Sequence, residues 1–248
     1  MIKALLAVLL VAAAGAARAT ECRVEGFDGA SFTICEVNLA QEELRLFLRD
    51  EAGSVMGSFT RVEQSLPPGR TLGFAVNAGM FHPDLRPVGL YIEDGVQEMR
   101  VVTSDGPGNF GLLPNGVFCI LEGRAAVIES RAYAANPPDC RHATQSGPML
   151  VIDGVLHPRF LPDSSSLNIR NGVGVDASGT RALFAISNQP VNFDHFGRLF
   201  RDRLQTPNAL YLDGRVSRLY APSVGRNDFG FPLGPIVGTV VDEDAAGR

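Results

Sequence analysis

The chain has 248 residues, of which 45% are hydrophobic and 20% charged, so it can bury a sizeable core. Its formal net charge of −5 argues against a nucleic-acid-binding protein, because such proteins carry basic surfaces. Only Lys3 among the 22 Lys and Arg residues is a lysine, which disfavours Schiff-base and pyridoxal-phosphate enzymes and Walker-type nucleotide sites. The 27 glycines and 16 prolines indicate many turns and short strands rather than a helical bundle.

The first 19 residues have the features of a secretory signal peptide. A short basic start is followed by an apolar run over 4–14 and by the small-x-small pattern Ala17-Arg18-Ala19. The apolar run is too short for a typical membrane span, although an uncleaved anchor is the alternative. We therefore expect a periplasmic or secreted protein that begins near Thr20, has no stable membrane span after cleavage, and forms one domain over 20–248.

Four cysteines in an oxidising compartment predict two disulfides. Cys22–Cys35 and Cys119–Cys140 close the shortest loops and are the favoured pairs among three possible pairings. The rival interpretation is structural zinc, but the chain has no Cys-x-x-Cys motif and its four histidines lack ligand spacing.

In the first part of the chain, leucines alternate with Arg45, Phe47 and Arg49 over 44–49, which predicts a half-buried strand. Residues 61–65 are predicted as a short helix. An apolar strand over 72–76 leads to Asn77. The strands over 88–93 and 96–102 flank Asp94-Gly95, a strong hairpin signal, and we interpret Asn115-Gly116 and Asp153-Gly154 as similar turns.

Further along the chain, 182–187 and 210–212 read as apolar strands. Between them, Asn192 is a candidate N-cap, followed by apolar residues at helical spacing: Phe193, Phe196, Leu199, Phe200 and Leu204. The sequence therefore predicts a single α+β domain with a mixed, largely antiparallel sheet core and a few helices.

Glycines and polar residues recur at the ends of the predicted strands. The segments are Asn-Ala-Gly-Met-Phe at 77–81, Ser-Gly-Pro-Met-Leu at 146–150, Arg-Asn-Gly-Val-Gly at 170–174 and Leu-Asp-Gly-Arg at 212–215. Such turns allow close backbone approach to a ligand and offer N–H donors. Taken singly, each segment is more typical of a turn than of a site.

In their order and approximate spacing, these four segments resemble the phosphodiester glycosidase family from about residue 72 to 240. The chain departs from the family pattern at Ala78 and Arg215, which both replace a glycine. The resemblance implies hydrolysis of a sugar linked through its anomeric carbon to a phosphodiester, with a sugar phosphodiester or polysaccharide of the envelope as substrate. It implies no cofactor.

The resemblance also suggests roles for individual residues. We expect Asp213 to stabilise or attack the oxocarbenium-like centre and Arg170 to hold the phosphate with its planar guanidinium. For substrate binding we expect the following residues: Asn77, Gly79, Ser146, Gly147 and Arg215. Metal stays unassigned, because no metal-loop spacing is present.

Other interpretations remain open at this point. Ser146 as nucleophile lacks a Gly-x-Ser-x-Gly elbow, and His82 or His195 could act as general acid or base. Asp176 and Asp194 could be second carboxylates. The protein could instead bind an envelope saccharide without cleaving it, or it could be a phosphodiesterase that cuts P–O. The sequence does not indicate an oligomeric state.

Overall fold

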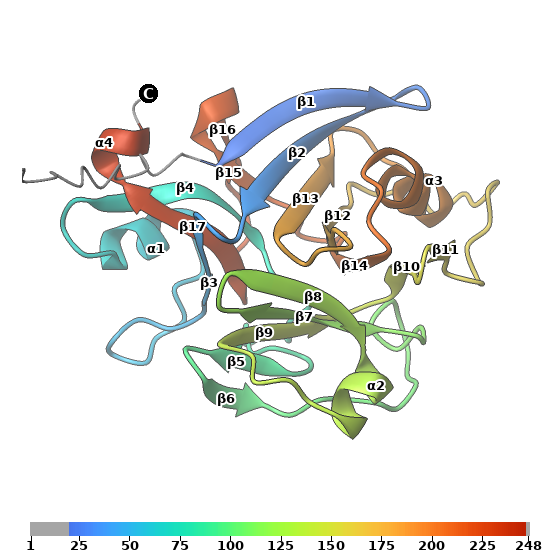
Figure 1. Ribbon diagram of the computed structural model, residues 1–248, viewed down its shortest axis with the longest axis horizontal. Coiled ribbons are helices and arrows are strands. Elements are labelled where there is room, and N and C mark those ends of the chain that lie inside the picture. The colour runs from blue at the N-terminus through green and yellow to red at the C-terminus, as the bar shows by residue number, and fades with distance from the viewer. Residues whose placement is uncertain (1–19, 247–248) are drawn as a thin grey trace, which may run out of the picture.

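The computed structural model describes residues 20–246, which form three antiparallel sheets (Figure 1). The predicted signal peptide lies outside these residues. The seven-stranded sheet has the order β1 (Glu21–Phe27), β2 (Ala30–Asn38), β13 (Arg181–Ser187), β12 (Asn171–Val175), β14 (Asn208–Asp213), β10 (Met149–Ile152) and β11 (Val155–Leu156).

Two five-stranded sheets complete the architecture. One has the order β16 (Arg226–Asn227), β15 (Leu219–Ala221), β4 (Arg70–Asn77), β17 (Ile236–Asp242) and β3 (Glu43–Phe47). The other, at the bottom of Figure 1, has the order β6 (Val96–Met99), β5 (Tyr91–Glu93), β9 (His142–Ser146), β7 (Gly116–Leu121) and β8 (Arg124–Glu129). The strand pairs within residues 20–246 are all antiparallel. This confirms the predicted α+β class with a largely antiparallel sheet core.

Phenylalanine packing joins the three sheets in one core. Phe184 of β13 has its ring centroid 4.9 Å from that of Phe74 in β4 and 5.7 Å from that of Phe118 in β7. All three side chains are buried. Because one aromatic ring contacts a ring from each of the other sheets, the strand ends around this core are held close together.

The helices are short (Figure 1), and two of them pack on sheet faces: Phe196 and Phe200 contact the seven-stranded sheet, and Phe59 and Val62 contact the sheet of β4 and β17. They are α1 (Phe59–Ser65), α2 (Ser130–Ala135), α3 (Phe193–Arg198), the π-helical turn η1 (Leu199–Arg203), the 3₁₀ turn η2 (Pro222–Val224) and α4 (Glu243–Ala246). The predicted helix after Asn192 is confirmed as α3 and η1: Asn192 Oδ1 accepts a hydrogen bond from the His195 N–H at 2.9 Å.

Two of the three predicted glycine turns are confirmed. Asp94-Gly95 joins β5 to β6 and Asp153-Gly154 joins β10 to β11, with positive φ at all four residues. Asn115-Gly116 is not a turn, and this prediction is wrong. Asn115 is buried and its Nδ2 donates to the Phe110 carbonyl at 2.8 Å, while Gly116 begins β7.

Both favoured disulfides, Cys22–Cys35 and Cys119–Cys140, are present. Cys22–Cys35 joins β1 to β2, and Cys119–Cys140 ties β7 to the segment before β9. Within residues 20–246, no helix has the length and apolar character needed to cross a membrane.

Candidate active site

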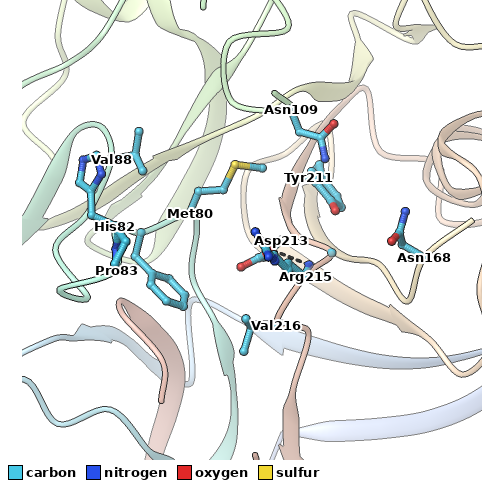
Figure 2. Close-up of a pocket in the computed structure, with 12 residues that line it drawn as sticks. Met80, His82, Pro83, Val88, Asn109, Asn168, Tyr211, Asp213, Arg215 and Val216 are labelled. Atoms are coloured by element: carbon cyan, nitrogen blue, oxygen red, sulfur yellow. Dashed lines mark hydrogen bonds between the residues drawn. The ribbon is translucent and has the colours of Figure 1, made fainter. Parts of the chain in front are cut away.

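A pocket of about 720 Å³ opens where strands of all three sheets end (Figure 2). It is lined by Met80, Phe81, His82, Pro83, Val88, Asn109, Asn168, Tyr211, Asp213, Gly214, Arg215 and Val216. The lining mixes apolar side chains with a few polar groups, which is typical of small-molecule sites. Asp213, at the end of a strand, is the only carboxylate among these lining residues.

Asp213 is the last residue of β14, and only 8% of it is exposed. Its Oδ1 accepts a hydrogen bond from the Arg215 N–H at 2.8 Å. Burial raises the pKa of the Asp213 carboxyl, and the backbone N–H groups of Gly214, Arg215 and Val216 oppose this rise. A carboxylate that is short of solvent and faces a pocket is suited to interact with positive charge that develops in a substrate.

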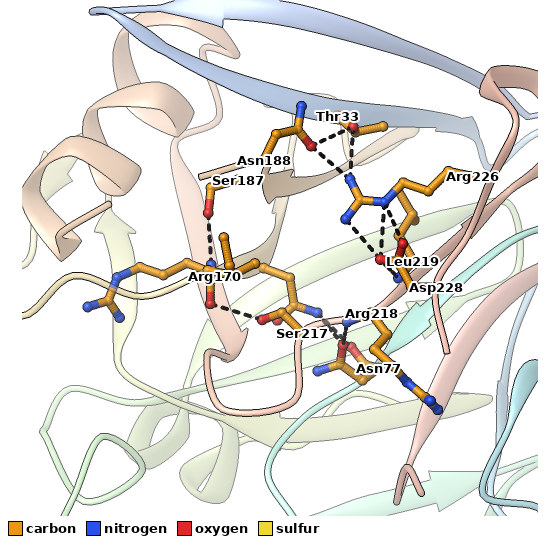
Figure 3. Close-up of polar contacts among 12 residues, drawn as sticks. Thr33, Asn77, Arg170, Ser187, Asn188, Ser217, Arg218, Leu219, Arg226 and Asp228 are labelled. Carbon is orange, nitrogen blue, oxygen red and sulfur yellow. Dashed lines mark hydrogen bonds and ion pairs between the residues drawn. The ribbon is translucent and has the colours of Figure 1, made fainter. Parts of the chain in front are cut away.

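Two asparagines hold the backbone at Asp213. Asn171, the first residue of β12, accepts the Asp213 N–H on its Oδ1 at 2.8 Å, at a bulge in the β12–β14 pairing. The Nδ2 of Asn171 donates to Asn77 Oδ1 at 2.8 Å, and this oxygen also accepts the Arg218 N–H at 3.0 Å (Figure 3). Since Asn77 ends β4, this network fixes Asp213 relative to a second sheet.

Tyr211 forms the wall of the pocket beside Asp213. Burial raises the pKa of Tyr211 well above its usual range, against the opposing charge of Arg170. A side chain at Gly214 would collide with the Tyr211 hydroxyl, so the glycine at this position permits the tyrosine to sit there. The hydroxyl therefore stays protonated at neutral pH and is available as a hydrogen-bond donor.

Arg170 lies behind this wall rather than in the pocket. It is fully buried; Nε donates to the Val191 carbonyl and Nη2 to the Ser166 carbonyl, both at 2.8 Å. Its guanidinium carbon is 3.6 Å from the ring centroid of Phe193, which packs edge-on against Tyr211 at 4.8 Å. The remaining nitrogen, Nη1, has no hydrogen-bond partner among residues 20–246.

Comparison with known proteins identifies the family. The model of the NAGPA family, described as phosphodiester glycosidase, matches residues 70–231. The chain belongs to the phosphodiester glycosidase family. It is also 33% identical over 184 residues to the uncharacterized protein YigE of Escherichia coli, which covers 74% of this chain and 72% of that protein.

Solved structures agree on the fold. The catalytic domain of zebrafish N-acetylglucosamine-1-phosphodiester alpha-N-acetylglucosaminidase, auto-inhibited by its pro-peptide, matches with a TM-score of 0.63 at 13% identity. The match covers 92% of this chain and 85% of that domain. A putative exported protein from Burkholderia pseudomallei matches with a TM-score of 0.53 at 11% identity, over 85% of this chain and 74% of that protein.

Of the seven site residues that we predicted in this phosphodiester glycosidase, Asp213 and Arg215 line the pocket. Arg215 is exposed and lies beside Asp213 (Figure 2). The other predicted residues are the following: Asn77, Gly79, Ser146, Gly147 and Arg170. None of these five lines the pocket, and each lies in the framework around it.

The framework contacts of the glycosidase motifs explain their residue types. Ser146 Oγ donates to the Leu212 carbonyl at 2.8 Å, which joins β9 to β14 one residue before Asp213. Gly79 has φ +141°, a conformation that favours glycine, and an added Cβ would lie 3.0 Å from Thr144 Oγ1. A Cβ at Gly147 would lie 2.5 Å from the Asn115 Cβ.

Of the other candidate histidines and carboxylates, only His82 lies at the pocket. His82 is exposed and lines the pocket, whereas His195 packs against Phe27 and Phe32 away from it. Asp176 accepts the N–H groups of its own turn, and Asp194 pairs with Arg198. Among residues 20–246, no cluster of three or more His, Cys, Asp and Glu side chains is placed to hold a metal ion.

Sequence reasoning did not assign roles to Asn171, Tyr211, Asn109 and Asn168. Asn171 lies inside a motif that we used for Arg170, and Tyr211 lies inside a strand that reads as apolar. Both have side chains whose partners come from distant segments. The one sequence signal that points to Tyr211 is its place two residues before Asp213 in the same strand, because alternate residues of a strand share a face.

Proposed function

We propose that this chain is an exported hydrolase that cleaves the glycosidic bond of a sugar-1-phosphodiester in an envelope or extracellular glycoconjugate. The observation that carries the proposal is Asp213, a nearly buried carboxylate that faces the pocket while asparagine and backbone N–H groups hold it in place. Membership of the phosphodiester glycosidase family supports the reaction class.

In the proposed reaction, the bond between the anomeric carbon and the phosphate oxygen breaks, and its electron pair leaves with the phosphate. The leaving group is a phosphate monoester, which departs as an anion and needs little proton donation. Asp213, in its ionised form, stabilises or attacks the positive anomeric centre, and water supplies the new C–O bond. The charged guanidinium of Arg215 at the pocket is the group that we assign to the phosphate.

Arg170 has a positioning role in this proposal. It supports Phe193 and Tyr211 from behind, so that the Tyr211 hydroxyl is held at the pocket wall. Asn77, Gly79, Ser146 and Gly147 act in the same indirect way, since they fix the strand ends that carry Asp213. Export is supported by the two disulfides, which persist in oxidising compartments.

Hydrolysis in ¹⁸O-labelled water tests the reaction class. An N-acetylglucosamine-1-phosphodiester is the first substrate to use, because the structurally similar zebrafish enzyme is named for it. The proposal predicts label in the sugar. Label in the released phosphate would contradict the proposal and would show that the protein is a phosphodiesterase that cuts the P–O bond. Saturable binding of a panel of sugar-1-phosphodiesters without turnover would also contradict the proposal and would show that the protein binds saccharides without cleaving them.

A further inference from the structure

The loop between β16 and β17 presents two phenylalanines to solvent. Phe229 is 93% exposed and Phe231 is 81% exposed, and they are the only aromatic side chains among the large exposed hydrophobic residues of 20–246. Gly230 between them has φ +151°, which side-chain-bearing residues rarely adopt. An exposed aromatic pair of this kind is unfavourable in water and points to a partner surface.

Both ends of this loop are fixed to the protein. Before the phenylalanines, the Asp228 carboxylate accepts the Leu219 N–H at 2.9 Å and pairs with Arg226. After them, the Leu233 N–H donates to the Gly57 carbonyl at 2.9 Å, and the Leu233 side chain is buried. The exposed rings are therefore carried on an anchored loop.

Arg218 lies under the same loop without a partner for its charge. Only 7% of Arg218 is exposed; its guanidinium carbon lies 5.6 Å from the Phe59 ring centroid, and a Cβ at Gly230 would be 3.8 Å from its Nη1. Its Nε is buried without a hydrogen-bond partner, and its side chain forms no hydrogen bond or ion pair with residues 20–246. Figure 3 shows the guanidinium pointing away from Asn77.

Asp228 is the acid that acts on the charge of Arg218, and it does not pair with Arg218. The Asp228 oxygens are occupied by Arg226 and by the Leu219 N–H. A buried arginine whose Nε has no partner and whose charge is not paired is costly, and an anionic ligand would remove that cost. An unpaired cationic side chain, Arg218, thus lies under the loop that carries the two exposed phenyl rings.

This loop backs the wall of the pocket. Leu233 and Val216 belong to the same apolar cluster, and Val216 lines the pocket. A Cβ at Gly234 would lie 2.6 Å from the Cβ of Phe81, which also lines the pocket. A surface bound by Phe229 and Phe231 would therefore lie next to the candidate active site.

We propose that Phe229 and Phe231 insert into an anionic phospholipid surface and that Arg218 binds the phosphate of a lipid headgroup. The two phenyl rings carry no polar group, so a surface that offers both an apolar layer and phosphate groups fits the rings and Arg218 together. Arg218 supplies charge complementarity to an anionic lipid. This docking goes beyond the proposed hydrolysis and does not depend on it.

Vesicle co-sedimentation tests the aromatic pair. The protein is mixed with vesicles of phosphatidylcholine and phosphatidylglycerol, or of phosphatidylcholine alone. We expect binding to the mixed vesicles, with partitioning at least about tenfold weaker for Phe229→Ser/Phe231→Ser, because two apolar rings are removed. The matched control, Val155→Ser/Leu161→Ser, removes two exposed apolar side chains elsewhere and should bind like wild type.

Arg218→Gln tests the headgroup contact, with its folding checked by thermal melting. We expect wild type to prefer anionic vesicles and to be stabilised by inorganic phosphate, and we expect Arg218→Gln to lose both effects. Asp213→Asn should bind vesicles like wild type. The proposal is overturned if wild type binds neither vesicle, or if the phenylalanine variant binds undiminished. It is also overturned if phosphate binds at Arg218 without any vesicle binding.

Discussion

The side-chain oxygen of Asn171 accepts the backbone N–H of Asp213 at 2.8 Å, while the same amide donates its Nδ2 to Asn77. The candidate catalytic carboxylate is thereby tied to the ends of two other strands. We expect Asn171→Ala to lower turnover by about tenfold or more and to destabilise the fold by about 1–3 kcal/mol, because a buried N–H loses its acceptor.

Measured turnover and urea unfolding of Asn171→Ala check this expectation. Asn188→Ala is the matched control: Asn188 follows β13, binds Ser31 of β2 and Arg226 of β16, and does not line the pocket. It should lose stability without losing turnover per folded molecule. Equal turnover losses in the two variants would mean that Asn171 has no special role in the site.

The contact between Gly214 and Tyr211 gives a second prediction. A Cβ at Gly214 would collide with the Tyr211 hydroxyl, so Gly214→Ala should destabilise the protein by about 1–3 kcal/mol. Tyr211→Phe removes that oxygen, and the double variant should recover much of the loss in a double-mutant cycle. Gly106→Ala, at a site with open space, is the control and should have little effect. Additive losses would show that the two residues do not collide.

Arg170→Lys gives a third prediction. The ammonium cannot replace both hydrogen bonds to the Val191 and Ser166 carbonyls, nor the guanidinium stacking on Phe193. We expect the free energy of unfolding to fall by about 2 kcal/mol, with turnover reduced mainly through kcat. Thermal melting and steady-state kinetics check this. A variant of unchanged stability with a raised KM alone would instead indicate direct phosphate contact.

Much of the fold could be predicted from local sequence patterns. The helix after Asn192, the Asp94-Gly95 hairpin and both disulfides depend on nearby residues, whose spacing is visible in the chain. Asn115-Gly116 failed because Gly116 pairs with Glu129 and Ser146 as the first residue of β7, while Asn115 donates to the Phe110 carbonyl. The burial of Arg170 depends on carbonyls of Ser166 and Val191, and a strand-end position alone does not reveal which side the side chain faces.

The candidate site was predictable in part for the same reason. Asp213 and Arg215 follow a strand at a glycine turn, and both line the pocket. Asn77 and Ser146 lie at strand ends as well, but their polar atoms are used between sheets, with Asn171 and with the Leu212 carbonyl. Contacts between residues so far apart in the chain set these roles, and a single sequence does not specify them.

His142 predicts how stability depends on pH. Its side chain is 2% exposed, and Nδ1 accepts the Asp94 N–H at 3.1 Å; burial lowers its pKa to about 4. The folded state thus favours neutral His142, whereas the same imidazole in the unfolded chain takes up a proton near pH 6.5. Stability from this residue is full above about pH 6.5 and falls as pH drops towards 4, by up to about 3 kcal/mol.

Urea unfolding of His142→Gln between pH 4 and 7 checks this, over the window that its pKa defines. The variant should show a flatter loss of stability on acidification. His82→Gln, which removes an exposed imidazole, should keep the wild-type slope. An unchanged slope in His142→Gln would assign the acid sensitivity to other groups.

The most direct test of a catalytic role for Asp213 is turnover of a sugar-1-phosphodiester by Asp213→Asn, compared with Asp153→Asn. Both aspartates precede a glycine in a turn, but only Asp213 lines the pocket. If Asp213 is the catalytic carboxylate, Asp213→Asn loses at least about a hundredfold in turnover with its melting temperature nearly unchanged, while Asp153→Asn keeps wild-type activity. Near-full activity of folded Asp213→Asn would contradict this role.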